Sequence, residues 1–326
     1  MKAFRIATPR HFEAVEIENR TTEQLGADEV LLRPIVGGIC GSDLPSFEGR
    51  RVAPIKLNRY VNGRLPAGLP LHEVVGEVLA CPNGRFELGA QVVGWVANSD
   101  ALAELVVTRS DNVVEFDPSL TPQQAVVMQP LACVMHTIAR LGSLADKRVA
   151  VIGLGPIGLL FCHAASNAGA SHVEGVDVVD RGRLAGTFRI DRVVHLASDR
   201  WVASLDESER FDVVIEAVGN QVGTLADAIS ALAQDGIVFY FGLPEDPVYP
   251  VALEELFMKA GTLMAGGVSH SNRTRALELA KDYVEQHPEF LAASVSHEFE
   301  FGDRLDDAYE MACNPSPERV KVIINF

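Results

Sequence analysis

The sequence has few cysteines, and no two of them stand at metal-finger spacing. The five cysteines are an odd number scattered along 326 residues: Cys40, Cys81, Cys133, Cys162 and Cys313. This pattern supports neither a disulfide framework nor a four-cysteine zinc site. Any cysteine chemistry must therefore belong to individual residues.

Long apolar runs and an excess of positive charge are also missing. No run approaches the roughly eighteen apolar residues of a membrane span, and residues 1–6 lack the apolar stretch of a secretory signal, so we expect a cytoplasmic protein with no membrane partner. The 28 basic residues stand against 44 acidic ones, a formal net charge of -16. Because such a charge repels phosphate backbones, nucleic acid is not an expected partner.

The chain divides into two parts with different patterns. Its length and its 48% content of hydrophobic residues suggest two domains with large cores. Short β-type runs at 30–36, 74–79, 91–96 and 103–107 predict a β-rich first part. A helical stretch follows from Thr121 to Gly142. Strands are then expected at 148–152, 173–178, 212–216 and 236–241, with helices at 158–169 and 224–233. This alternation predicts an α/β domain with a parallel sheet.

A glycine-rich loop follows the first strand of the alternating part. The run 149–158, Val-Ala-Val-Ile-Gly-Leu-Gly-Pro-Ile-Gly, places G-x-G-x-x-G between a buried strand and a helix. Gly153 permits the turn, Gly155 lets the backbone approach a pyrophosphate, and Gly158 lets the helix pack closely. Pro156 and Ile157 begin the helix, whose free N–H groups attract the anion. The run predicts a dinucleotide-binding loop, with a plain tight turn as the weaker alternative.

Asp177 ends the next strand about twenty residues further on, where a carboxylate can accept hydrogen bonds from the adenosine ribose. An acid there repels a 2′-phosphate, so NAD is the predicted cofactor. Arg181 and Arg183 lie just downstream and could reach a 2′-phosphate, which keeps NADP possible.

The dinucleotide-binding domain is expected to span 134–266. Its pattern is complete there, so the tail, with helices at 274–286 and 303–312 and a last strand at 320–325, is assigned to a first domain of 1–133 and 267–326.

Two other segments bring together side chains that zinc prefers. Residues 38–43, Gly-Ile-Cys-Gly-Ser-Asp, carry Cys40, and residues 71–76, Leu-His-Glu-Val-Val-Gly, carry His72 and Glu73. Thiolate, imidazole and carboxylate are zinc ligands, and a catalytic zinc needs three or four protein ligands and one open position. Taken singly, such a cysteine or histidine is more often a core residue, so the three are candidates as a set.

With these motifs the chain resembles the medium-chain zinc-dependent family of alcohol, polyol and sugar dehydrogenases. The matching segments are 38–43, 72–78, 129–132, 153–158, 216–220, 241–244 and 320–323. The resemblance implies a Rossmann dinucleotide-binding domain and a β-rich, GroES-like catalytic domain. It implies Cys40 and His72 as zinc ligands, Glu73 as a ligand or near-ligand, Gln129 as the remaining ligand or holder of a water, and Ser42 as the proton acceptor.

For the cofactor, the resemblance implies that Lys321 approaches the pyrophosphate and that Phe241 and Leu243 lie beside the nicotinamide. Val218, in the segment 216–220, is also counted with the cofactor-binding residues.

The cysteine-rich lobe that binds a second zinc in many relatives is missing between Cys81 and Gly94, so one zinc per chain is expected. Many relatives have Glu or Cys at position 129, and many have a proton-passing His at position 45, which is proline here.

The predicted function is hydride transfer between a nicotinamide cofactor and a secondary alcohol or ketone, of polyol, sugar or cyclitol type, with zinc as Lewis acid. One alternative is a zinc-free, NADPH-dependent reductase of quinones or enoyl compounds, which would normally lack the Cys40, His72 and Glu73 set. Another is a non-catalytic dinucleotide-binding protein. A homo-oligomer, dimer or tetramer, is implied because the edge strand of such a nucleotide domain commonly pairs across a dimer axis.

The segment 47–70 is longer than the family pattern leads us to expect. Its polar and basic residues are Arg50, Arg51, Lys56, Arg59, Tyr60, Asn62 and Arg64. A solvated loop is the favoured interpretation, because charge runs usually face water. The alternative is a lid over a polar or anionic substrate such as a sugar, cyclitol or phosphorylated polyol.

Overall fold

The computed structural model describes residues 1–50 and 65–326, and the chain forms two compact units. Unit 1 comprises Met1–Ala132 and Ser269–Phe326, and unit 2 comprises Cys133–Val268. Most of the segment 47–70, interpreted above as a solvated loop or a lid, lies outside the described residues, including Arg51, Lys56, Arg59, Tyr60, Asn62 and Arg64. Across the described part, no helix is long and apolar enough to cross a bilayer.

Unit 1 is organised around a mostly antiparallel sheet. Within the described residues, its strands follow the order β14 (Val295–Glu300), β15 (Lys321–Asn325), β3 (Glu29–Gly38), β4 (Glu73–Ala80), β5 (Gln91–Trp95) and β7 (Val113–Glu115), and β6 (Val106–Arg109) also pairs with β3. The last strand, β15, pairs antiparallel with β3 and parallel with β14. The C-terminal tail is therefore part of the same sheet as the N-terminal strands.

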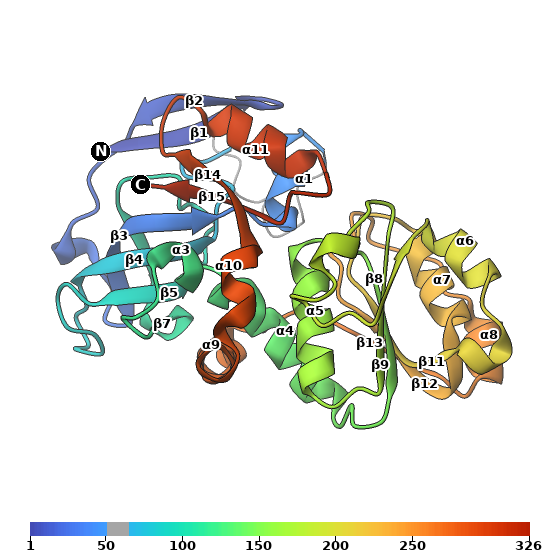
Figure 1. Cartoon of the computed structure of the whole chain (residues 1–326). Helices are drawn as coiled ribbons and strands as arrows, with labels where there is room; N and C mark the ends of the chain where they lie inside the picture. Colours follow the sequence, from blue (N-terminus) through green and yellow to red (C-terminus); the bar gives the residue numbers. More distant parts are fainter. Residues whose placement is uncertain (51–64) are drawn as a thin grey trace. The chain divides into compact units, whose positions relative to one another are not determined.

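A hairpin and several helices pack around this sheet (Figure 1). The hairpin consists of β1 (Lys2–Thr8) and β2 (His11–Glu16). The helices are α1 (Leu44–Phe47), α3 (Pro122–Ala125), α9 (Arg273–Gln286), α10 (Leu291–Ser294) and α11 (Leu305–Cys313). The core between hairpin, α1 and α11 contains Phe12, Phe47 and Tyr309, whose rings lie 4.9 to 5.4 Å apart between centroids. Stacked and tilted aromatic pairs at these distances favour tight packing.

Unit 2 contains a parallel sheet in the order β10 (Arg192–His195), β9 (His172–Asp177), β8 (Arg148–Ile152), β11 (Phe211–Glu216), β12 (Leu232–Tyr240) and β13 (Thr262–Ala265). Its helices are α5 (Pro156–Asn167), α6 (Ser198–Ala203), α7 (Gly223–Ser230) and α8 (Leu253–Met258), and α4 (Met128–Leu141) leads into it from unit 1. Figure 1 shows α5 on one face of the sheet and α6 and α7 on the other. The α/β class with a parallel sheet predicted from the sequence is confirmed.

Several predicted segments differ in their limits from the observed elements. The helical stretch from Thr121 to Gly142 is two helices, because α3 ends at Ala125 and α4 begins at Met128. The strand expected at 236–241 begins earlier, at Leu232, because Leu232 pairs with Phe211 before residues 233–236 bulge out of register. Asp235 in this bulge has a φ of 58°, and Asp and Gly are disfavoured in strands, which hides the early start from the sequence.

Candidate functional site

The metal-ligand candidates lie where the end of β3 pairs with the start of β4. β3 ends at Gly38, and Cys40 follows it as the residue that begins the 3-10 turn Gly41–Asp43. His72 immediately precedes β4, whose first residue, Glu73, pairs with Gly38. The antiparallel register of β3 and β4 therefore brings the two motif segments together, although about thirty residues separate them in the chain.

A thiol, an imidazole and a carboxylate meet at this point. One ligand atom of each of Cys40, His72 and Glu73 lies within 4.8 Å of the others. Glu73 is buried, and the other two are half-buried. Within residues 1–50 and 65–326 this is the one such cluster of three or more His, Cys, Asp or Glu side chains. The structure thus brings together the three candidates that the sequence selected as a set.

Asp43 holds the imidazole of His72 in place. Its Oδ1 lies 2.9 Å from His72 Nδ1, and its Oδ2 accepts a hydrogen bond of 3.0 Å from the Cys40 amide. Burial by itself lowers the pKa of His72, but the negative Asp43 and the neighbouring Cys40 outweigh it and raise the pKa to about 10. An imidazole held through Nδ1 presents Nε2 to a metal ion.

Lys321 forms a buried ion pair with Glu73. The lysine is 3% exposed and the glutamate 0% exposed. Lys321 Nζ pairs with Glu73 Oε2 and donates a hydrogen bond of 3.1 Å to the carbonyl of Ile39. Glu73 Oε1 is buried without a hydrogen-bond partner among the described residues. Lys321 thus lies against the ligand cluster, and its approach to the cofactor pyrophosphate stays a prediction.

These donors fit a zinc ion. Thiolate sulfur, imidazole nitrogen and carboxylate oxygen are the three ligand types of protein zinc sites. The unpartnered oxygen of Glu73 is a buried acceptor that a cation would satisfy. Gln129 is buried in the first turn of α4, and Ser42 is half-buried in the turn that carries Asp43. Their roles as ligand and proton acceptor remain predictions.

In unit 2 the glycine-rich loop joins β8 to α5. Gly153 has a φ of 93°, in the region that favours glycine, and a Cβ on Gly158 would overlap the carbonyl oxygen of Gly153. The chain itself therefore requires glycine at both positions. A Cβ on Gly155 would meet nothing within 4 Å. Gly155 precedes Pro156 at the start of α5, so the space beside it lies at the helix N-terminus, where an anion is favoured.

Asp177 ends β9 and is bound to this loop. Its Oδ2 accepts a hydrogen bond of 2.6 Å from the Leu154 amide, and its Oδ1 accepts one of 2.7 Å from the Val179 amide. The carboxylate is thus fixed beside the glycines. Of the two arginines downstream, Arg181 is 1% exposed whereas Arg183 is exposed.

The remaining predicted cofactor residues follow the next two strands of the same sheet. Val218 comes after β11, and Phe241 and Leu243 come after β12, so all lie at the carboxyl ends of parallel strands, where such sheets bind ligands. Sequence reasoning missed the part played by Glu216. Its Oε1 accepts hydrogen bonds from the amides of Val218 and Gly219, at 3.1 and 2.9 Å. Through these two hydrogen bonds the Glu216 side chain fixes the turn that follows β11. Burial raises the pKa of its carboxyl group.

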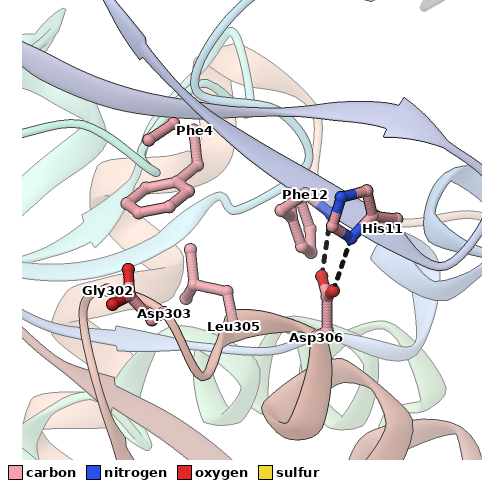
Figure 2. A pocket seen from close by; sticks show the side chains of 8 residues that line it. Phe4, His11, Phe12, Gly302, Asp303, Leu305 and Asp306 are labelled. Atoms are coloured by element: carbon pink, nitrogen blue, oxygen red, sulfur yellow. Dashed lines mark hydrogen bonds and ion pairs between the residues drawn. The ribbon is translucent and has the colours of Figure 1, made fainter.

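A separate cavity of ≈ 230 Å³ lies in unit 1 between the β1–β2 hairpin and the start of α11 (Figure 2). Phe4, Phe12 and Leu305 line it together with His11 and Asp306, whose Nδ1 and Oδ2 atoms lie 2.8 Å apart in a hydrogen bond. No residue of the ligand cluster lines this cavity, so it is not the candidate site.

The chain matches known dehydrogenases over most of its length. Residues 156–282 match the family model described as zinc-binding dehydrogenase. The chain is 30% identical over 246 residues to an L-threonine 3-dehydrogenase of Saccharopolyspora erythraea, covering 68% of this chain and 71% of that protein. It is 24% identical over 322 residues to a sorbitol dehydrogenase of Halalkalibacterium halodurans, covering 92% of each. An alcohol dehydrogenase from Thermus sp. ATN1 has the same fold, with a TM-score of 0.81, 22% identity and 100% of both chains covered.

The chain belongs to the family of medium-chain zinc-dependent alcohol and polyol dehydrogenases, and it is an oxidoreductase. The family, the enzyme class and the combination of a Rossmann domain with a GroES-like domain, all predicted from the sequence, are confirmed. Neither the zinc-free reductase nor the non-catalytic binding protein gains support from these relatives.

Proposed function

We propose that the chain oxidises a secondary alcohol of polyol, sugar or cyclitol type with NAD, using one zinc ion held by Cys40, His72, Glu73 and Gln129. The observation that carries this proposal is the convergence of thiol, imidazole and buried carboxylate within 4.8 Å. The relatives named for sorbitol and L-threonine support the substrate class, because both compounds carry a secondary hydroxyl group.

The residues of unit 1 prepare this site for the reaction. When bound, zinc supplies Lewis acidity toward the substrate oxygen, and the nicotinamide accepts the hydride. Asp43 orients the His72 ring through Nδ1, and Lys321 holds one oxygen of Glu73. Ser42 Oγ takes the hydroxyl proton. Because position 45 is proline, the proton leaves Ser42 by a route that does not use a side chain there.

The surroundings of Asp177 favour NAD over NADP. Two backbone amides fix its carboxylate beside the glycine loop, where it accepts hydrogen bonds from ribose hydroxyls and repels a 2′-phosphate. Arg181 is buried and therefore poorly placed for a 2′-phosphate. Arg183 is exposed, and it is the residue through which NADP use remains possible.

Metal removal tests the proposed function. Protein purified without added metal or chelator is expected to hold about one zinc per chain, measured by mass spectrometry. A chelator should abolish NAD-linked oxidation of polyols, and added zinc should restore it, because the Lewis acid leaves and returns. Metal-free protein that keeps its rate would contradict the mechanism and favour the zinc-free reductase.

A matched pair of glycine variants tests the cofactor loop. Gly155→Ala is expected to leave stability nearly unchanged and to weaken NADH binding about tenfold, because its methyl group enters only the space predicted for the pyrophosphate. Gly158→Ala should instead destabilise the protein by about 1–3 kcal/mol, because its methyl group overlaps the Gly153 carbonyl. Thermal unfolding and NADH fluorescence titration measure the two effects. Equal NADH affinity in Gly155→Ala and wild type would place the pyrophosphate elsewhere.

We also propose a homo-oligomer, dimer or tetramer, in the cytoplasm. Support comes from the edge of the unit 2 sheet, where β13 pairs only with β12 among the described strands. Apolar side chains are exposed on this strand and on α8, among them Leu263 on the strand and Phe257 and Met258 on the helix. An edge strand flanked by exposed apolar groups is suited to pairing with a second copy.

A further inference from the structure

Two segments of unit 2 meet at the carboxyl ends of β11 and β12. We call residues 217–222 the β11 turn and residues 241–252 the β12 loop. Gly219 in the β11 turn has a φ of 82°, and a Cβ there would overlap the amide nitrogen of Leu243 in the β12 loop. A Cβ on Gly242 would in turn overlap the backbone of Gly219. The two segments are therefore in direct backbone contact, with no room for a side chain between them.

The backbone carbonyl of Gly219 accepts hydrogen bonds from two tyrosines. The hydroxyl of Tyr240, the last residue of β12, donates to it at 2.8 Å, and the hydroxyl of Tyr249, in the β12 loop, donates to it at 3.2 Å. The two tyrosine rings lie edge to face, with 6.0 Å between their centroids. The Tyr249 hydroxyl also accepts a hydrogen bond of 3.1 Å from the Glu245 amide. This one hydroxyl group thus joins two parts of the β12 loop to the β11 turn.

Glu216 holds the parts of both segments that lie nearest to the strands. Its backbone carbonyl accepts hydrogen bonds from the amides of Phe241 and Gly242, at 2.9 and 3.1 Å. Its side-chain Oε1 accepts from the β11 turn and, at 2.9 Å, from the hydroxyl of Thr224 in α7. Tyr249 adds a fixed point further along the β12 loop, beyond the residues that Glu216 reaches.

These two segments carry the residues predicted for the nicotinamide end of the cofactor. Val218 belongs to the β11 turn, and Phe241 and Leu243 belong to the β12 loop. Leu243 is 49% exposed, so an apolar side chain is available there to cover a planar ring. The adenosine end is proposed to lie at Asp177 and the glycine loop, which follow β9 and β8. Because the sheet order is β9-β8-β11-β12, the two ends of the cofactor have separate supports, and Tyr249 belongs to the nicotinamide side.

We infer that Tyr249 is a positioning residue for the nicotinamide end of the cofactor: its hydroxyl ties the β12 loop to Gly219 and so fixes Leu243 relative to Val218. The inference rests on the proposed function, because it takes a nicotinamide cofactor to bind at this end of the sheet. Segments that are held in one arrangement bind a ligand more tightly, because binding then requires less ordering. Tyr249 acts through the backbone of the two segments.

The test compares Tyr249→Phe with wild type on two ligands. NADH contains the nicotinamide ring, whereas ADP-ribose has the same adenosine and pyrophosphate groups without it. The substitution keeps the aromatic ring but removes the donor to Gly219 and the acceptor of the Glu245 amide, so the dissociation constant of NADH should rise about two- to tenfold. The dissociation constant of ADP-ribose should be unchanged, because the supports of the adenosine end are intact. Isothermal titration calorimetry measures both constants.

The control and the outcomes separate this inference from the proposed function. Tyr283→Phe, which changes a buried tyrosine of α9 in unit 1, should alter neither constant. Equal NADH affinity in Tyr249→Phe and wild type overturns the inference while the proposed function stands. An equal loss of affinity for NADH and ADP-ribose overturns it too, since the hydroxyl would then only support the fold of unit 2. If wild type itself does not bind NADH, the proposed function fails, and the inference fails with it.

Discussion

The Cys40→Ser enzyme is expected to lose its zinc and at least about a thousandfold in kcat/KM for a polyol substrate, a loss of about 4 kcal/mol of transition-state stabilisation. Serine replaces a soft thiolate with a hydroxyl that binds zinc poorly, and the proposed ligands that remain, His72, Glu73 and the neutral Gln129, do not replace the anionic sulfur. Metal analysis and steady-state kinetics on the same preparation measure both effects.

Two controls make this result specific. Cys81→Ser should keep zinc and rate, because Cys81 follows the opposite end of β4 and its Sγ lies 3.1 Å from Asn83 Oδ1. NADH binding by Cys40→Ser should be unchanged, because the glycine loop belongs to unit 2. Full zinc content in Cys40→Ser would show that the thiol is not a ligand.

Replacing Lys321 with methionine is expected to destabilise the metal-free protein by about 3–5 kcal/mol, the usual cost of leaving a buried charge without its partner. Lys321 and Glu73 are 3% and 0% exposed, so water cannot compensate for the lost ammonium group. The change should appear as a lower denaturant midpoint in equilibrium unfolding.

An exposed ion pair in the same sheet supplies the comparison. Arg33 and Glu77 join β3 to β4, with side chains 57% and 31% exposed, so Arg33→Met should cost less than about 1 kcal/mol. Adding Glu73→Leu to Lys321→Met should recover much of the lost stability, because no unpaired charge then remains. If Lys321→Met costs no more than Arg33→Met, the buried pair does not stabilise unit 1.

Local pattern was sufficient to locate the elements on which the site is built. The runs at 30–36, 74–79 and 91–96 lie within or nearly coincide with β3, β4 and β5, because β-branched residues there pack on a pleated sheet. The sequence placed the glycine loop correctly between β8 and α5, because the spacing of its glycines is set by the tight turn and the close packing of the helix that follows. Short strands such as β10 and β13 were not identified, because four residues give too little periodicity.

The partners of the site residues could not be predicted in the same way. The sequence selected Cys40, His72 and Glu73 from their residue types and motif register, and the register of β3 with β4 brings them together. Asp43 was visible only as part of a motif, and its hydrogen bond to His72 depends on that same register. Lys321 reaches Glu73 only because β15 pairs with β3, a contact between distant parts of the chain that carries no local signal.

The pairing of β15 with β3 also fixes the order in which a newly made chain can complete its catalytic machinery. Unit 2 is one continuous segment and can fold as soon as residues 133–268 have left the ribosome. The metal centre has to wait for β15, which follows unit 2 in the chain, because Glu73 receives its counter-ion only with Lys321. Until β15 has been made, the growing polypeptide therefore has a complete nucleotide domain and an incomplete unit 1 sheet, in which the acid Glu73 lacks its base.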